Sequence, residues 1–297
     1  MKPRTWLFAV VAAALYVLFN ADEALAWGAG THVQLGTEML ARLGLLPASV
    51  ATILARHAID YLYGNVAADV VFAKRWSRVK QFCHHWTTGF ALLDRCGDGR
   101  GQAFALGYLS HLAADTVAHG KFIPRQLAVT GTTMNFGHLY WELRADSLLA
   151  PDSADRLEAL ARYDFTVHHA RMAEVMTQTF LPYEVNLRVF ERITHLMTRR
   201  PLLRSMGMWG VYSRWPLCGD LLRRYHDECL ERMASVLSEQ ERSPVLHEDP
   251  NGSSALLQVR VHRRHVRLLR RGGLALDHLL YDAAASYAPT NRPATTA

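Results

Sequence analysis

Two histidines and a carboxylate within residues 107–119 form the pattern in this sequence that is best suited to chemistry. His111, Asp115 and His119 follow one another at intervals of four residues, so a helix would place all three side chains along one face. The rest of the segment is almost entirely apolar, which predicts a buried helix. A buried carboxylate between two imidazoles is costly unless a positive ion binds there, and zinc takes both kinds of ligand. The alternative is a hydrogen-bonded polar network that holds no ion.

A second helical pair follows soon afterwards, because His138 and Glu142 also lie four residues apart. On its own, such a pair is equally typical of a helix surface. Its closeness in sequence to His119 favours a shared site, since three ligands from two neighbouring helices can hold one zinc ion.

Further candidate ligands lie upstream of these helices. Asp69 stands in a stretch of small residues, where an ion can approach the chain closely. His84 and His85 are adjacent, and His32 follows Trp27 by five residues. Each of these residues alone is more typical of a structural or surface role. Together with the central helix they offer Asp, His, His and Asp for one ion, and His32 for another.

The first residues predict export from the cell. Two basic residues, an apolar run over residues 6–19 and the sequence Ala24-Leu25-Ala26 match a signal peptide that spans residues 1–26. The apolar run is shorter than the ~20 residues of a spanning helix, which disfavours the alternative of a retained anchor. Cleavage would give a secreted or periplasmic protein that begins at Trp27. A free α-amino group has a pKa of ~7.7–8.0, so this terminus could bind a metal at neutral pH beside His32.

The helical period runs through nearly all of the chain, which predicts an all-α fold. With 297 residues, half of them apolar, the chain can build one large core, and we expect a compact multi-helix domain over residues 27–288. The tail, residues 289–297, is rich in Pro and Thr and is expected to be disordered. Thr31 is the expected N-cap of the first helix. The expected helices span about residues 31–44, 47–64, 101–120, 136–149, 219–240 and 255–282, with two more that open at residues 151 and 182.

Taken together, these residues resemble the secreted zinc-dependent phospholipases C and the related zinc-dependent single-strand nucleases. The resemblance covers residues 27–142 and implies a cluster of two or three zinc ions. It implies that the amino and carbonyl groups of Trp27 bind zinc, that His84 rather than His85 is a ligand, and that Asp115 bridges two ions. The full set of metal ligands implied by the resemblance is Trp27, His32, Asp69, His84, His111, Asp115, His119, His138 and Glu142.

The reaction implied by the resemblance is hydrolysis of a phosphodiester by a metal-activated water, with Asp69 orienting or deprotonating that water. A phospholipid substrate would yield diacylglycerol and a phosphorylated head group. The short spacing from Trp27 to His32 is nuclease-like, whereas Glu142 is phospholipase-like. A nuclease or nucleotidase is therefore the alternative enzyme, and it would need an aromatic platform such as Tyr61, Phe72, Trp76 or Trp86. A protein that keeps zinc only for folding is the non-catalytic alternative.

Charge and surface patterns give weaker indications about partners. The net charge of +6 suits anionic substrates or lipid surfaces. We expect a monomer with no stable nucleic-acid partner, and peripheral contact with a membrane. The basic stretch 262–267 is either a solvated face or a patch for lipid head groups or nucleic acid. Residues 122–124 are either an exposed apolar rim or ordinary core, and His168 and His169 are expected at the surface.

The remaining indications concern cysteine and methionine. The four cysteines permit two disulfides, with sequence proximity favouring Cys83–Cys96 and Cys218–Cys229, or they are buried free thiols. Met197, Met206 and Met208 are expected in the core.

Overall fold

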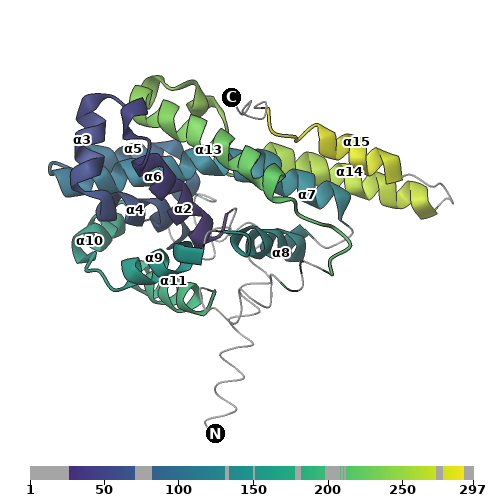
Figure 1. Cartoon of the computed structure of the whole chain (residues 1–297), viewed down its shortest axis with the longest axis horizontal. Helices are drawn as coiled ribbons and strands as arrows, with labels where there is room; N and C mark the ends of the chain where they lie inside the picture. The colour runs from purple at the N-terminus through teal and green to yellow at the C-terminus, as the bar shows by residue number, and fades with distance from the viewer. Residues whose placement is uncertain are drawn as a thin grey trace, which may run out of the picture.

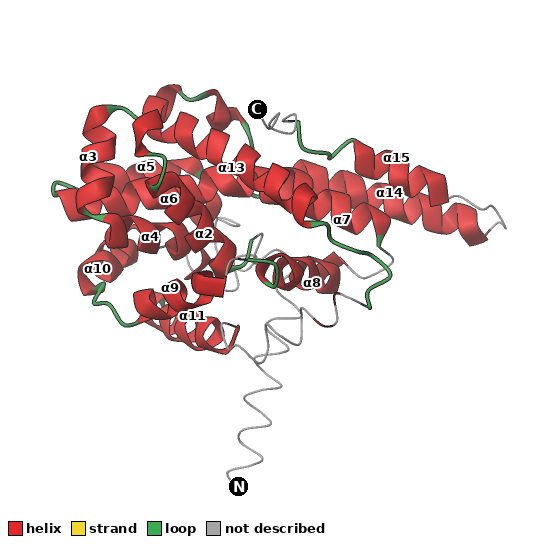
Figure 2. Cartoon of the chain, viewed as in Figure 1, coloured by secondary structure: helices red, strands yellow, loops and turns green. Residues whose placement is uncertain are grey.

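All regular structure in the described part of the chain is helical. The computed structural model describes residues 27–70, 82–130, 134–149, 151–177, 182–197, 208, 210, 212–271 and 277–290, and these ranges contain no strand (Figure 2). The predicted all-α class is therefore confirmed. The predicted signal peptide, residues 1–26, lies outside the described residues. No helix within them combines the length and the apolar character that crossing a bilayer requires.

The helices follow one another with short connections (Figure 1). A π-helical turn, η5, directly continues α6. The longer helices are α2 (Ala29–Leu40), α3 (Ala48–Arg56), α4 (Ala58–Ala67), α5 (Trp86–Asp94), α6 (Gly99–Val117), α7 (Ile123–Val129), α8 (Met134–Asp146), α9 (Pro151–Ala161), α10 (Thr166–Val175), α11 (Tyr183–Met197), α13 (Gly219–Glu239), α14 (Ser253–Arg271) and α15 (Asp277–Ala285). The shorter turns are η1 (Leu43–Leu45), η2 (Ala68–Val70), η4 (Phe82–His84), η5 (Ala118–Phe122), η6 (Gln240–Arg242) and η7 (Pro244–His247).

Helix α6 is the central element of the fold. It is buried on all sides, and α2, α4, α5 and α13 pack around it (Figure 1). One face of α6, including Leu109, Ala113 and Val117, belongs to an apolar cluster that extends to α13. The opposite face, including Phe104 and Leu112, belongs to a second cluster that extends to α10. A helix with apolar residues all around it is stable only in such an interior position, so the side chains that it carries are held rigidly.

Two glycines allow α4 to cross α6 at close range. A Cβ atom on Gly64 would lie 2.1 Å from the Phe104 carbonyl oxygen, and one on Gly107 would lie 2.1 Å from the Tyr61 carbonyl oxygen. Any side chain at either position would force the helices apart. This close crossing places the end of α4, and the η2 turn that follows it, beside the middle of α6.

Several element boundaries differ from the prediction. Helix α2 begins at Ala29, and Thr31 does not cap it, because the Thr31 amide and hydroxyl both donate to Asp146 on α8. The predicted helix over 47–64 is interrupted at His57, whose backbone leaves the helical region. The predicted helix over 255–282 is described as α14 and α15, with residues 272–276 outside the description.

Burial corrects several surface and core predictions. His168 is completely buried rather than exposed, because Asp60 supplies a polar partner inside the fold. Met208 is 60% exposed instead of belonging to the core, whereas Met206 lies outside the described residues. Phe122 and Ile123 are fully buried, so the alternative of an exposed rim at these residues is wrong.

The cysteines adopt the second of the two expected states. All four are free thiols in the structure, with Cys218 exposed and the other three buried. Near the C-terminus, the Pro289 carbonyl oxygen accepts a hydrogen bond from Arg224, and the Thr290 hydroxyl donates one to Glu228, both on α13. Residues 291–297 lie outside the described part.

Candidate metal centre

The predicted ligand side chains converge from separate elements of the fold. Helix α6 supplies two of them, the turns η2 and η4 supply one each, and α2, η5 and α8 supply the others. All eight predicted side-chain ligands are buried. They are His32, Asp69, His84, His111, Asp115, His119, His138 and Glu142.

Three ligand atoms at the centre form a nearly equilateral triangle. The Nε2 atoms of His84 and His111 are 3.2 Å apart, and each lies 3.1 Å from Oδ2 of Asp115. Zinc holds nitrogen and oxygen ligands at ~2.0–2.1 Å in a tetrahedron, whose edges are then ~3.3–3.4 Å. The spacing of the three atoms is therefore close to that of one face of a zinc coordination tetrahedron.

The protons available to this triangle are too few for its acceptors. Nδ1 of His111 lies 2.8 Å from the Asn65 carbonyl oxygen, which can only accept, so His111 donates its proton there. With that proton on Nδ1, the tautomer of His111 that can bind a metal has the lone pair of Nε2 facing the Asp115 carboxylate. Both oxygens of Asp115 are buried and accept no hydrogen bond within the described residues. Buried polar atoms are rarely left without a hydrogen bond, and a bound cation would compensate the charge of these two oxygens.

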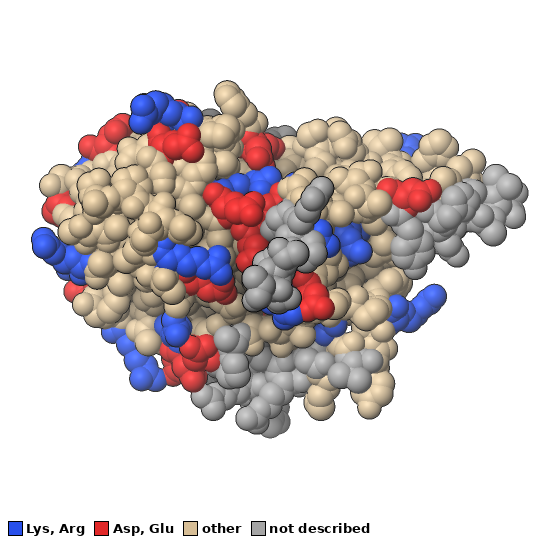
Figure 3. All heavy atoms as spheres, turned by 45° about the horizontal axis from the view of Figure 1, so that its top comes forward, with Lys and Arg blue, Asp and Glu red and all other residues tan. Residues whose placement is uncertain are grey.

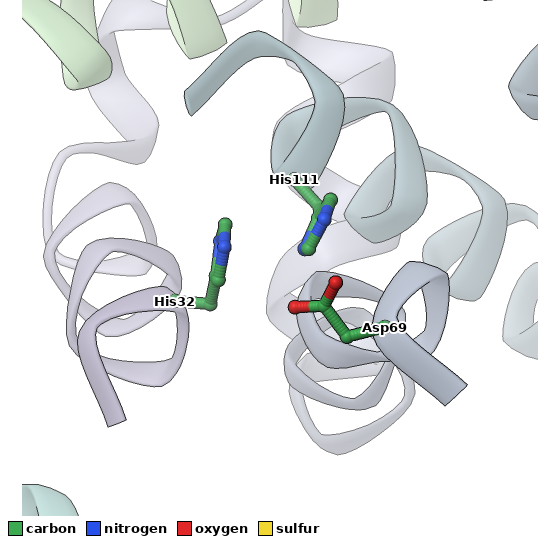
Figure 4. A group of neighbouring side chains, drawn as sticks. All are labelled: His32, Asp69 and His111. Carbon is green, nitrogen blue, oxygen red and sulfur yellow. The ribbon is translucent and has the colours of Figure 1, made fainter. Parts of the chain in front are cut away.

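A second group of ligand atoms adjoins the triangle. His32, Asp69 and His111 place one ligand atom each within 4.8 Å of the others, and Figure 4 shows the three side chains directed toward one another from separate helical segments. The His32 ring stacks on the His111 ring at 3.9 Å, and its Nε2 lies 3.4 Å from Oδ1 of Asp115. Asp115 thus turns one oxygen to His32 and the other to His84 and His111, which suits a carboxylate that bridges two ions.

The third group extends the centre toward α8. Nε2 of His138 lies 3.1 Å from Oε1 of Glu142, and the His138 ring meets the His119 ring edge-on at 5.2 Å. Nε2 of His119 is 3.9 Å from Oδ2 of Asp115, which connects this group to the central triangle. His119 lies in the π-helical turn η5, and such turns occur frequently at functional sites.

The electrostatics of the centre favour ligands in their metal-binding protonation states. Burial, followed by the nearby His111, lowers the pKa of His32, so its imidazole is neutral at neutral pH. Burial alone would raise the pKa of Asp115, but its interactions with His111, His32 and His84 together outweigh burial and hold that pKa well below the ordinary range. A neutral imidazole and an ionised carboxylate are the forms that bind zinc.

Trp27 is packed tightly beside the centre. Its side chain is fully buried, stacks on Phe122 of η5 with a centroid distance of 4.5 Å, and meets the edge of the His226 ring. Burial lowers the pKa of His226 to about 4, so this ring is neutral as well. The start of the described chain is therefore fixed against the element that carries His119.

The structure also shows supporting residues that the sequence analysis missed. Asp146 accepts two hydrogen bonds from Thr31, next to His32, and burial raises its pKa to about 6. It lies four residues after Glu142, so a continuation of the His138–Glu142 spacing could have indicated it. Asn65 orients His111 through its backbone, which no side-chain pattern reveals.

Comparison with protein families bears on whether this buried cluster is an ion-free network or a zinc site. Residues 31–188 match the model of the family described as zinc dependent phospholipase C. The chain belongs to this family. The match to the zinc-dependent phospholipase C family spans more than half of the chain. It includes every side chain that the sequence predicted as a ligand. No curated protein and no solved structure matches the chain significantly.

The geometry also bears on two alternatives from the sequence. Of the adjacent histidines, His84 lies in the central triangle, whereas His85 is the N-cap residue of α5. Tyr61 is fully buried with its hydroxyl on Ser110, so it cannot serve as a platform for a nucleobase. Trp86 is half-buried, and Phe72 and Trp76 lie outside the described residues.

Proposed function

We propose that this protein is a secreted zinc-dependent phosphodiesterase that hydrolyses phospholipids to diacylglycerol and a phosphorylated head group. The observation that carries the proposal is the triangle formed by His84, His111 and Asp115, whose facing acceptor atoms have the spacing of zinc ligands. Membership of the zinc-dependent phospholipase C family supports the reaction class.

The buried side chains suit two or three zinc ions. We assign the first ion to the site around the central triangle, the second to the N-terminal segment and the third to the group on η5 and α8. The proposed ligands are Asp69, His84, His111 and Asp115 for the first ion, Trp27 and His32 for the second, and His119, His138 and Glu142 for the third. When bound, zinc would supply positive charge for the phosphate oxygens and lower the pKa of a water toward ~7.

The side chains of the centre then orient the reactants and move protons. Asp69 lies at the edge of the centre, with Oδ1 3.4 Å from Nε2 of His84, and we assign it the proton of the attacking water. The water oxygen bonds to phosphorus as the bond between phosphorus and the glycerol oxygen breaks, and the glycerol oxygen takes up a proton that Asp69 returns through water. His111 keeps one tautomer and one orientation because Asn65 accepts from its Nδ1. Burial of the whole group strengthens each of these interactions.

The decisive experiment compares substrate classes with the full chain exported from an expression host. Phosphatidylcholine, phosphatidylglycerol and single-stranded DNA are each incubated with the protein before and after treatment with a zinc chelator, and the lipid products are separated. We expect diacylglycerol release that the chelator abolishes and added zinc restores. Hydrolysis that survives complete removal of zinc, or hydrolysis of DNA alone, would reject the proposal.

A separate measurement tests the export step and the terminal ligand. We expect N-terminal sequencing of the exported protein to begin at Trp27, and elemental analysis to give two or three zinc ions per chain. A variant with one alanine inserted before Trp27, which moves the new amino group away from His32, is expected to bind one ion fewer. An unchanged zinc content in that variant would remove Trp27 from the ligand set.

A further inference from the structure

Helix α14 carries the strongest concentration of positive charge in the sequence. Its 19 residues include six arginines and two histidines and not one acidic residue. It packs with α7 and α15 to form an arm that extends from the helical body (Figure 1). At ~1.5 Å per residue the helix is ~28 Å long. The basic stretch noted in the sequence, residues 262–267, lies in its middle.

One face of α14 packs against the protein. Leu256, Val259 and Val266 are buried on this face, together with the stem of Arg263. They fall at intervals of three and four residues, as expected for the inward side of an amphipathic helix. This buried face accounts for the packing on α7, α15 and η5, so it leaves the opposite face without a structural role.

The outward face combines large apolar side chains with arginines. Leu257, Val261 and Leu268 are 58%, 60% and 55% exposed, and they lie in one line along the helix. Arg260, Arg264, Arg267 and Arg271 are exposed alongside that line, on one side of it. Other charged helices in this protein pair their arginines within the helix, as Arg156 does with Asp152 on α9. A purely solvated face would need neither the apolar line nor the absence of acids.

The base of α14 touches the metal centre. Gly252, immediately before the helix, has φ of +57°, and a Cβ atom there would lie 2.2 Å from the His119 carbonyl oxygen. The side-chain amide of Asn251 donates to the His84 carbonyl oxygen at 3.2 Å. The N-terminal end of α14 is therefore fixed against the backbone of two candidate zinc ligands. Figure 3 shows one face of the molecule, on which basic and acidic side chains lie in neighbouring small groups.

We propose that the outward face of α14 docks the enzyme on anionic lipid bilayers, with the apolar line entering the head-group region and the arginines binding lipid phosphates. An amphipathic helix that is rich in arginine and has exposed leucine and valine binds membrane interfaces in this way. The inference rests on the proposed phospholipase function and narrows its substrate to phospholipids presented in negatively charged bilayers.

The test measures binding separately from hydrolysis. Flotation of the full chain with vesicles of phosphatidylcholine, with and without phosphatidylglycerol, is compared for the wild type and two triple variants. One variant combines Arg260→Gln, Arg264→Gln and Arg267→Gln, and the other combines Leu257→Ser, Val261→Ser and Leu268→Ser. The matched control, Arg56→Gln with Arg95→Gln and Arg242→Gln, removes three exposed arginines outside the arm. Circular dichroism and zinc content verify that each variant folds.

We expect the wild type and the control to bind vesicles that contain phosphatidylglycerol and to release them at high salt. Loss of three arginines is expected to weaken this binding about 100-fold, since each contributes about fivefold at an anionic surface. The apolar variant is expected to lose about tenfold. Hydrolysis of a soluble short-chain substrate is expected to stay unchanged in both.

Two results would overturn this inference. The first is equal vesicle binding by the arginine variant and the control. The second is loss of binding to single-stranded DNA in the arginine variant with unaltered vesicle binding, which would assign the face to nucleic acid. Vesicle binding through α14 in a protein that hydrolyses no phospholipid would instead sustain the docking face and reject the proposed function.

Discussion

The protein contains two buried clusters of histidine and aspartate, and they differ in how their polar atoms are satisfied. The metal centre lies where α2, α6, α8 and the turns η2 and η4 meet. The second cluster lies between α4 and α10, where His168 stacks on Phe104 at 4.4 Å and reaches Asp60. Both clusters join an imidazole to a carboxylate inside an apolar environment, so composition alone does not distinguish them.

In the second cluster every polar atom has a protein partner. Nε2 of His168 lies 2.7 Å from Oδ1 of Asp60, and Nδ1 lies 3.3 Å from Nη1 of Arg171. Arg100 donates to both oxygens of Asp60. Burial lowers the pKa of His168, and a neutral ring with one donor and one acceptor fits these neighbours. The carboxylate is compensated by a guanidinium, and no ion is needed.

The metal centre lacks such compensation. No arginine or lysine is paired with Asp115 in the described part of the chain, where its neighbours are four histidines. Its two oxygens accept no hydrogen bond there. The balance of donors and acceptors, rather than the presence of histidine and aspartate, therefore separates a structural cluster from one that is built for a cation.

Among the changes that test this difference between the clusters, removal of the central carboxylate is expected to have the largest effect on activity and zinc content. Asp115→Asn should lower phosphodiesterase activity by more than ~100-fold and reduce the zinc content, because outer-sphere partners of metal ligands already contribute 10–100-fold. Steady-state kinetics and elemental analysis measure both quantities. The exposed Asp152 provides the control, as Asp152→Asn should leave them unchanged.

The response of Asp115→Asn to zinc distinguishes a lost ligand from a damaged fold. The histidines around Asp115 hold its pKa low, so this variant should lose some stability even without zinc. It should also lose most of the stabilisation that zinc gives the wild type. Calorimetry of both proteins with and without zinc provides the comparison, and a variant that zinc stabilises as much as the wild type would show that Asp115 acts only as a structural network residue.

Withdrawal of zinc is expected to have the next largest effect. A ligand at ~1,000 times its dissociation constant stabilises the native state by ~4 kcal/mol, so a chelator should lower the unfolding midpoint by several degrees. Thermal unfolding with and without chelator measures this difference. Asp60→Asn should show the same chelator-dependent decrease, since the second cluster holds no ion, and a decrease abolished by that substitution would contradict the distinction.

The second cluster itself is expected to contribute stability only. Asp60→Asn should lower the free energy of unfolding by about 2–3 kcal/mol, because it weakens charged hydrogen bonds from Arg100 and His168. Zinc content and activity should remain those of the wild type. Denaturant unfolding measures the loss, and a reduced zinc content in the folded variant would mean that the two clusters are coupled.

The sequence indicated which residues gather at the candidate metal centre more fully than it indicated those of the second cluster. His111, Asp115 and His119 could be recognised because one helix sets their spacing, and every predicted side-chain ligand is buried in the structure. His168 was assigned to the surface, because its partner Asp60 lies 108 residues away and no local period connects them. The four-residue spacing from Glu142 could have indicated Asp146, but not its pairing with Thr31, which lies 115 residues away. Local spacing is readable from sequence, whereas pairing between distant helices depends on packing.

Asp146 offers the smallest and most specific test. Because burial raises its pKa from 3.8 to about 6, the native state holds a proton that the unfolded state has lost between these two pH values. The stability that this group contributes is therefore complete below pH ~4 and is lost as the pH rises toward 6. Asp146→Asn should lack this loss, so the free energy of unfolding of the variant should increase relative to that of the wild type as the pH rises. At ~1.4 kcal/mol per pH unit the ceiling is roughly 3 kcal/mol, and partial exposure of Asp146 reduces the expected gain to about 1–2 kcal/mol.

Urea unfolding of both proteins from pH 4 to 7 measures the difference directly, and titration of the shared zinc ligands cancels in it. A constant difference across this range would mean that Asp146 keeps an ordinary pKa and is ionised while it holds Thr31.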